Sequence, residues 1–311
     1  MRILAIVGMA LMLAACAPPA LALRMPEAPT PAEPGHEVGS FVGTGGVQLF
    51  EQSWHPAGTA LGVVVIHHGL KSHSAHYAEL ARHLVARGFA VYAYDMRGHG
   101  RSSGPRASLD DFEELVSDLD TFVRRVQARE PGRPTFVIGH SVGGAVVTLY
   151  ALERHPSIAG LVLLAPALRT DTPTLVLAAG PLTAALMPNF PVVDVPDSAF
   201  LRDPAMLAEM GSDPLIYHPV GPARTGAALL RALEQVWARA EELEVPLLAL
   251  HGTADRATDP RGSAEIVRRA RSRDKTLLLY RGLYHDLVRE PEREAVMNDI
   301  VTWIERHTPP R

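Results

Sequence analysis

A serine between two glycines, at the junction of a strand-like and a helix-like segment, constrains this chain most. Residues 135–138 are β-rich and mostly apolar, Gly139-His140-Ser141-Val142-Gly143 follows, and the next residues are small and apolar. This order predicts a buried strand, a sharp turn and a helix. A serine hydroxyl becomes a good nucleophile only when such a turn holds it beside a base and oxyanion donors. Ser141 is therefore the candidate nucleophile.

The same five-residue pattern occurs a second time, at Gly100-Arg101-Ser102-Ser103-Gly104. No strand leads directly into this copy, and Pro105 follows it. Arginine, glycine and serine in this order are typical of a polar loop. A short pattern needs its structural setting to carry meaning, and this copy lacks it.

From residue 41 onward, strand-like and helix-like segments alternate. We expect strands at 47–54, 61–67, 89–95, 135–138, 161–165, 245–251 and 276–280, and helices at 77–87, from 108 to about 126, from the elbow to about 154, and at 263–271 and 291–306. Ser108 is expected to cap the second helix, paired with Asp111. The alternation predicts an α/β fold with a mostly parallel central sheet and helices on both faces.

Residues 169–240 interrupt this rhythm with several prolines, an apolar run and a helix around 227–240. A long insertion between two sheet strands is usually functional, and we interpret it as a cap over the site. Its apolar side chains could serve packing or could contact a ligand; they are Leu175, Leu177, Leu182 and Leu186.

The N-terminus has the features of an export signal. Arg2 precedes an apolar stretch at 3–15, which is too short to span a bilayer. The stretch ends in Leu13-Ala14-Ala15-Cys16, which resembles the lipobox of bacterial lipoproteins. That resemblance implies removal of residues 1–15, diacylation of Cys16 and, with Ala17 next, sorting to the outer membrane.

An ordinary signal peptide, cleaved near Ala22 without an anchor, is the alternative. Residues 16–40 are rich in proline, and we expect a disordered tether there. The folded domain is then expected at 41–311, with the cap at about 169–240. The net charge of −4 and the lack of a Lys/Arg cluster argue against a nucleic-acid partner.

The strand, elbow and helix are similar to those of α/β-hydrolases, in which an acid and then a histidine follow the serine. His285 comes just after the strand at 276–280, at the edge of the sheet where ligands bind in such folds. Asp255 comes four residues after the strand ending at His251. Asp259 competes with it, but precedes Pro260 and fits a helix cap. Asp286, which adjoins His285, is expected to point elsewhere.

The oxyanion donors are expected to be the backbone amides of Val142 and Leu70, because Gly69 permits close approach. We assign no metal to His67 and His68, since adjacent residues on a strand face opposite ways.

Taken together, the chain resembles the monoacylglycerol lipases, within the lysophospholipase and serine-hydrolase branch of the α/β-hydrolases. The segments that carry the resemblance are His68-Gly69, Tyr94-Asp95, Gly98-His99-Gly100-Arg101-Ser102, Gly139 to Gly144, Ser212-Asp213-Pro214-Leu215-Ile216, Gly252 to Arg256, Asp274-Lys275-Thr276 and Gly282-Leu283-Tyr284-His285. The similarity extends from about residue 45 to 306, and is weakest in the cap.

This resemblance implies a Ser141–Asp255–His285 triad, donors at Leu70 and Val142, and an apolar cap that admits an acyl chain. It implies a lipid ester as substrate, with no metal or organic cofactor. A lysophospholipase or a broad carboxylesterase is the close alternative. A serine peptidase and a non-catalytic surface-binding lipoprotein are more distant ones.

Overall fold

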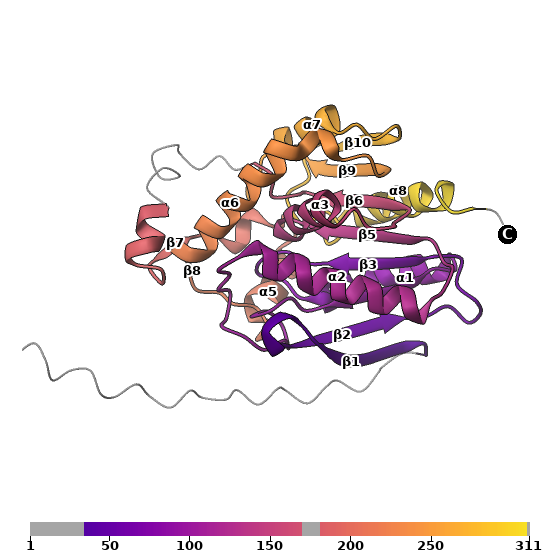
Figure 1. Ribbon diagram of the computed structural model, residues 1–311, viewed down its shortest axis with the longest axis horizontal. Coiled ribbons are helices and arrows are strands. Elements are labelled where there is room, and N and C mark those ends of the chain that lie inside the picture. The colour runs from indigo at the N-terminus through magenta and orange to yellow at the C-terminus, as the bar shows by residue number, and fades with distance from the viewer. Residues whose placement is uncertain (1–33, 170–180, 310–311) are drawn as a thin grey trace, which may run out of the picture.

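An eight-stranded sheet forms the centre of the molecule in the computed structural model, which describes residues 34–169 and 181–309 (Figure 1). Its strand order is β1-β2-β4-β3-β5-β6-β9-β10. The strands are β1 His36–Val42, β2 Gln48–Trp54, β3 Val63–His67, β4 Ala90–Tyr94, β5 Thr135–His140, β6 Gly160–Leu164, β9 Leu247–Gly252 and β10 Lys275–Tyr280. The pairs β1–β2 and β2–β4 are antiparallel, and all others are parallel. The predicted mostly parallel sheet is confirmed.

Helices cover both faces of this sheet. One face carries α2 Phe112–Arg129, α3 Val142–Arg154, α6 Ala223–Arg239 and α7 Pro260–Arg269, and the other carries α1 Ala78–Ala86 and α8 Arg293–Arg306 (Figure 1). The described apolar side chains form two clusters, one on each side of the sheet, and a third, smaller cluster within the cap. The central strands are buried along both faces, which explains their continuous apolar sequence.

Two predicted boundaries differ from the structure. Strand β1 begins at His36 and pairs with β2, so the tether predicted to reach residue 40 overlaps this strand. Its alternating exposed and half-buried residues gave only a weak strand pattern. The predicted cap at Ser108 is wrong: Asp111 caps α2, and its side chain accepts a hydrogen bond from the Glu113 amide at 3.0 Å. Asp259 caps α7, as predicted.

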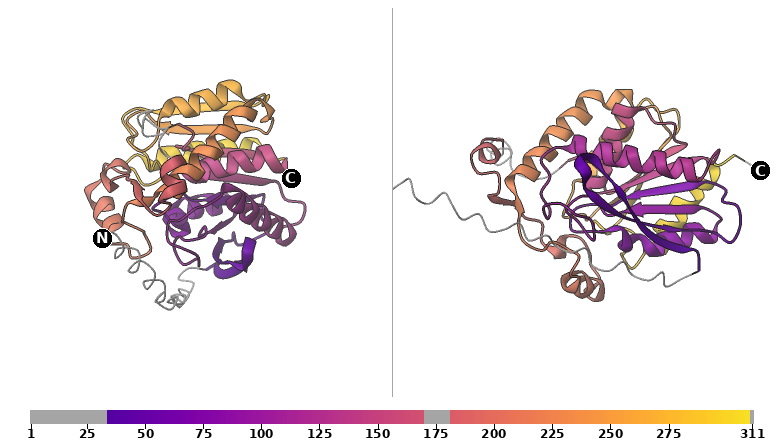
Figure 2. Two further views of the ribbon diagram at one scale, coloured as in Figure 1. Left: turned by 60° about the vertical axis from the view of Figure 1, so that its left-hand side comes forward. Right: turned by 60° about the horizontal axis from the view of Figure 1, so that its bottom comes forward.

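The insertion between β6 and β9 forms a separate layer at one end of the sheet (Figure 2). It contains a small sheet of β7 Pro191–Val193 and β8 Gly221–Pro222, the helix α5 Pro204–Ser212, and the start of α6. Short 3-10 helices in the described part of the chain are Thr44–Gly46, Ser74–Tyr77, Asp197–Ala199 and Ala240–Glu242. Leu175 and Leu177 lie outside the described residues. Leu182 and Leu186 are exposed to solvent, so neither packs in the described part of the core.

No helix among the described residues is long and apolar enough to span a membrane.

Candidate active site

Ser141 lies on a strained turn between β5 and α3. Its backbone has φ 55° and ψ −122°, a conformation that L-residues avoid and that surrounding structure must hold in place. The flanking glycines make the turn possible. A Cβ atom at Gly139 would lie 2.5 Å from the carbonyl oxygen of Gly143, and one at Gly143 would lie 2.4 Å from the carbonyl oxygens of His67 and His68. Both positions therefore require glycine, because the neighbouring backbone leaves no room for a side chain.

His285 and Asp255 lie together in the loops that follow β10 and β9. Both side chains are fully buried, and the His285 Nδ1 is 2.8 Å from the Asp255 Oδ2. A carboxylate only accepts hydrogen bonds, so this contact fixes the proton of neutral His285 on Nδ1. The Nε2 atom is left with its lone pair, and it is buried without a hydrogen-bond partner among the described residues. An imidazole in this state can accept a proton.

Two further side chains hold Asp255 in place. The Nε2 of His251 is 3.0 Å from the same Oδ2 atom, and the Thr258 hydroxyl donates to it at 2.9 Å. The amides of Ala257 and Thr258 donate to the other carboxylate oxygen. Burial acts to raise the pKa of Asp255, but the charge of His285 and these hydrogen bonds outweigh it and hold the pKa well below its usual range. Asp255 is therefore ionised.

His251 and Thr258 were missed by the sequence analysis, which treated His251 only as the end of a strand. The Ser263 hydroxyl is 2.7 Å from the His251 Nδ1 and fixes the ring orientation. The spacing of a strand-end histidine four residues before an aspartate was the available signal.

A second histidine supports the other side of His285. The Tyr77 hydroxyl donates to the His140 Nδ1 at 2.8 Å, which leaves the His140 Nε2 to donate to the His285 carbonyl oxygen at 3.3 Å. The two rings lie 4.8 Å apart. Burial lowers the pKa of His140 to about 4, and the neighbouring His285 acts in the same direction. Because His140 adjoins Ser141 in the chain, these contacts bring the His285 ring to the elbow.

The cap covers His285 through Phe200, whose ring meets the imidazole edge-to-face at 5.2 Å. The carbonyl oxygen of Phe200 also accepts a hydrogen bond from the Asp286 amide. The Asp286 side chain is buried beside Arg289 at 3.5 Å and does not contact Asp255 in the described structure. It therefore points away from Asp255, as expected, and lies against the buried side chain of Arg289.

The loop after β3 passes close to the elbow. A Cβ atom at Gly69 would lie 2.7 Å from the Ser141 Cβ, so only glycine fits there. His68 fixes the loop. The Met96 amide donates to its Nε2 at 2.8 Å, so its Nδ1 donates to the Gly69 carbonyl oxygen at 2.7 Å. Burial holds the pKa of His68 well below 6.5, in keeping with this neutral form. Both ring nitrogens of His68 are therefore used by backbone groups.

The backbone amides of Leu70 and Val142 are the predicted oxyanion donors. Leu70 follows Gly69 in the loop beside Ser141. Val142 is the first residue of α3, where helical amides have no carbonyl partner within the helix. Both positions suit the stabilisation of negative charge on an oxygen near Ser141.

The second copy of the serine pattern is a loop, as predicted. The Ser102 hydroxyl donates to the Asp95 carbonyl oxygen and accepts from the Phe50 amide, so it ties the loop to the sheet. It has no base beside it among the contacts described.

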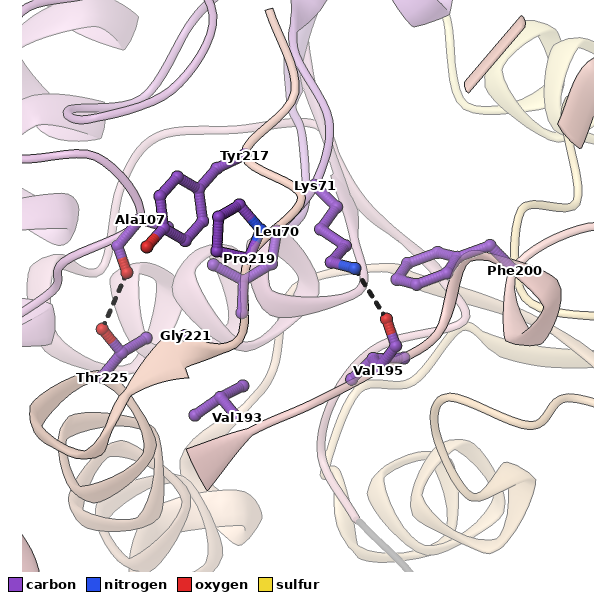
Figure 3. A pocket seen from close by; sticks show the side chains of 10 residues that line it. All are labelled: Leu70, Lys71, Ala107, Val193, Val195, Phe200, Tyr217, Pro219, Gly221 and Thr225. Carbon is purple, nitrogen blue, oxygen red and sulfur yellow. Dashed lines mark hydrogen bonds between the residues drawn. The ribbon is translucent and has the colours of Figure 1, made fainter. Parts of the chain in front are cut away.

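An apolar pocket opens next to the oxyanion loop, between the core and the cap (Figure 3). Its cavity volume is about 30 Å³, within a wider hollow of about 380 Å³ that includes open solvent. Its lining residues are Leu70, Lys71, Ala107, Val193, Val195, Phe200, Tyr217, Pro219, Gly221 and Thr225. Leu70 and Phe200 connect the pocket to the predicted oxyanion site and to His285.

Lys71 is the one charged residue of this lining. Its ammonium donates to the Val195 carbonyl oxygen at 2.8 Å and to the Asp197 carboxylate at 3.1 Å, which ties the oxyanion loop to the cap. Among the described residues, one group could hold a metal ion: His73, His76 and Asp213. It lies outside the pocket lining.

Known proteins resemble this chain in sequence and in structure. Residues 58–292 match the family described as serine aminopeptidase S33. A monoacylglycerol lipase of Mycolicibacterium smegmatis is 38% identical over 271 residues, covering 86% of this chain and 96% of its own. The human monoglyceride lipase is 36% identical over 295 residues, with 91% and 97% covered.

Among solved structures, the Paleococcus ferrophilus monoacylglycerol lipase has a TM-score of 0.75 at 30% identity, covering 83% of this chain and 99% of its own. A soluble variant of the Saccharomyces cerevisiae monoglyceride lipase has a TM-score of 0.80 at 23% identity, covering 92% and 100%. These similarities include the cap, since they extend over most of each chain.

Proposed function

The chain belongs to the α/β-hydrolase family that is described as serine aminopeptidase S33 and includes the monoacylglycerol lipases, and we propose that it cleaves monoacylglycerols. Its monoglyceride lipase relatives within this family make it a serine ester hydrolase. The apolar pocket beside the oxyanion loop is the observation that supports an acyl chain as the group bound.

In the proposed mechanism, the Nε2 of His285 accepts the hydroxyl proton of Ser141 while the Ser141 Oγ attacks the carbonyl carbon of the ester. The amides of Leu70 and Val142 hold the negative oxygen of the tetrahedral intermediate. His285 then protonates the leaving glycerol, and water repeats the cycle on the acyl-enzyme. Asp255 keeps the Nδ1 proton in place and stabilises the imidazolium, as in other serine hydrolases.

Two features of the site support the proton transfer. The Nε2 of His285 is buried and without a partner in the described structure, so its lone pair is available to accept the Ser141 proton. The carboxylate of Asp255 receives five hydrogen bonds, from His285, His251, the Thr258 hydroxyl and two amides. It is therefore oriented before substrate arrives, which is the arrangement that lowers the barrier most.

The pocket lining favours an ester over a peptide with a free amine. An aminopeptidase needs a carboxylate to bind the substrate ammonium, and the described lining contains none. Its charged residue is Lys71, whose ammonium is already paired with Asp197 and so offers no site for a substrate ammonium. Lysophospholipids stay the close alternative, because they too carry one acyl chain.

A substrate panel tests the proposal. The full chain is assayed with 1-monooleoylglycerol, lysophosphatidylcholine, dioleoylglycerol and an aminoacyl p-nitroanilide, with Ser141→Ala as the control. We expect kcat/KM to be highest for monooleoylglycerol, and no turnover above background for Ser141→Ala. A preference for lysophosphatidylcholine would replace the proposed substrate, and cleavage of the anilide alone would refute an ester hydrolase.

We also propose that Cys16 anchors the enzyme in the cell envelope, at the outer membrane. The lipobox-like Leu13-Ala14-Ala15-Cys16 supports this, and an anchor would hold the site near membrane-derived lipids. Labelling of cells with radioactive palmitate tests it. We expect the label on the wild-type chain and none on Cys16→Ser, whereas equal labelling of both, or of neither, would contradict the anchor.

A further inference from the structure

Two histidines and an aspartate from distant parts of the chain converge at the junction of the core and the cap. His73 and His76 belong to the loop that continues from the oxyanion loop, and Asp213 ends helix α5 of the cap. The Nε2 atoms of His73 and His76 lie 2.8 and 3.3 Å from the same Asp213 Oδ2. The two rings are 4.0 Å apart. No local pattern marks this cluster, because 140 residues separate His73 from Asp213.

The distances between these atoms suit ligands of one metal ion. All three ligand atoms lie within 4.8 Å of one another. With bonds of about 2.0–2.1 Å, neighbouring ligands of a metal lie about 2.9 Å apart in octahedral and about 3.3 Å apart in tetrahedral geometry. The observed 2.8 and 3.3 Å are close to these values.

The surroundings also suit a cation. The Ser72 hydroxyl is 3.0 Å from the His76 Nδ1, and so orients the ring with Nε2 toward Asp213. The side chains of His73 and His76 are 5% and 7% exposed, but Asp213 is 18% exposed and gives access from solvent.

Nearby charges are mostly negative. Asp286 and Glu209 both lie beside Arg289, at 3.5 and 3.3 Å, so this guanidinium is already paired. Two carboxylates therefore share this one arginine.

We propose that His73, His76 and Asp213 form a binding site for Zn²⁺ that joins the cap to the oxyanion loop. Two imidazoles and a carboxylate are a ligand set that zinc prefers, and water would complete the coordination. The ion would not take part in the ester cleavage, since the cluster is absent from the pocket lining. It would hold the end of α5 against the loop that carries Leu70, and so fix the cap over the site. This inference is independent of the substrate.

Zinc titration of the full chain tests the proposal. The protein is purified in detergent without a polyhistidine tag, stripped with EDTA and dialysed, and is then titrated with Zn²⁺ against a chromophoric zinc indicator. We expect one Zn²⁺ per chain with a micromolar or lower Kd. At 100 times the Kd, bound zinc is expected to raise Tm by about 5 °C or more. Replacement by Co²⁺ should give the visible absorption bands of a nitrogen- and oxygen-bound ion.

Matched variants locate the ion. Asp213→Asn keeps the size of the side chain and should weaken Zn²⁺ binding at least 10-fold, and His73→Gln with His76→Gln should abolish it. His83→Gln, which changes a histidine bonded to Asn298, and Cys16→Ser should leave the Kd unchanged. Far-ultraviolet circular dichroism and fluorophosphonate labelling report whether each variant is folded. A wild-type chain that binds no stoichiometric Zn²⁺, or folded cluster variants with an unchanged Kd, would overturn the site.

Discussion

Gly69→Ala tests how closely the oxyanion loop approaches the candidate nucleophile. The added Cβ would lie 2.7 Å from the Ser141 Cβ and 3.0 Å from the His140 carbonyl oxygen. Ordinary van der Waals contact begins at 3.4 Å, so the loop must move away from Ser141 by about 0.7 Å. The φ angle of Gly69 lies outside the left-handed region, so backbone strain adds nothing to this effect.

That displacement is enough to break one oxyanion contact. A hydrogen bond from the Leu70 amide, normally about 2.9 Å between heavy atoms, would lengthen to about 3.6 Å and cease to be one. Loss of one such donor costs about 2.7–4 kcal/mol in the transition state. We therefore expect kcat/KM on a p-nitrophenyl ester to fall by about 10²–10³-fold. The overpacking costs about 1–3 kcal/mol of folding stability, or a few degrees in Tm.

Gly58→Ala is the matched control, because a Cβ at Gly58 meets no atom within 4 Å. Both variants are assayed at 25 °C, where circular dichroism shows whether they are folded. Near wild-type kcat/KM in folded Gly69→Ala would refute the reasoning. So would an equal loss of activity in Gly58→Ala.

Three other perturbations test the contacts around His285 and the effect of the buried histidines on stability. Asp255→Asn should lower kcat about 10⁴-fold, as an amide favours the wrong histidine tautomer; a loss below 10-fold would contradict its role. Tyr77→Phe leaves the buried His140 Nδ1 without its donor, which should cost about 1–3 kcal/mol and lower Tm by about 2–10 °C in calorimetry; an unchanged Tm would show that the bond contributes nothing. Burial lowers the pKa of His67, His99 and His140 to about 4, whereas unfolded histidine titrates near 6.5. The unfolded chain therefore binds more protons between these values, so stability is present above pH 6.5 and is lost as the pH falls toward 4, by up to about 1.4 kcal/mol per pH unit for each histidine. A Tm that stays flat from pH 7 to pH 5 would contradict this.

The sequence predicted the parallel sheet and its helices because the central strands are uniformly apolar and because helical spacing is regular. The prediction of β1 failed because an edge strand that is exposed on one face carries few apolar residues. Ser108 was mistaken for the helix N-cap because Asp111 follows it at the third position, as in a capping box. The Leu109 amide instead donates to the Thr225 hydroxyl of the inserted cap, so the helix has not begun there. Local patterns do not reveal such a tertiary contact.

The candidate site likewise contains residues that could be predicted from the sequence and residues that could not. Ser141, Asp255 and His285 each follow a strand in a recognisable order, so their loops could be identified from the sequence. His251, Thr258 and Tyr77 act through contacts that form only in the folded chain, and only the spacing of His251 four residues before Asp255 offered a signal. The pairing of His73 with Asp213 depends on how the cap packs against the core, which local sequence patterns do not show.

Site-resolved labelling with a fluorophosphonate tests the central claim, that Ser141 is the activated nucleophile of an ester hydrolase. The full chain is treated with the probe, digested, and mapped by mass spectrometry, alongside Ser141→Ala and Ser102→Ala. We predict one phosphonylated residue, Ser141, in the wild type and in Ser102→Ala, and no label on Ser141→Ala. An unlabelled wild-type chain, or a label on any other serine, would contradict the account.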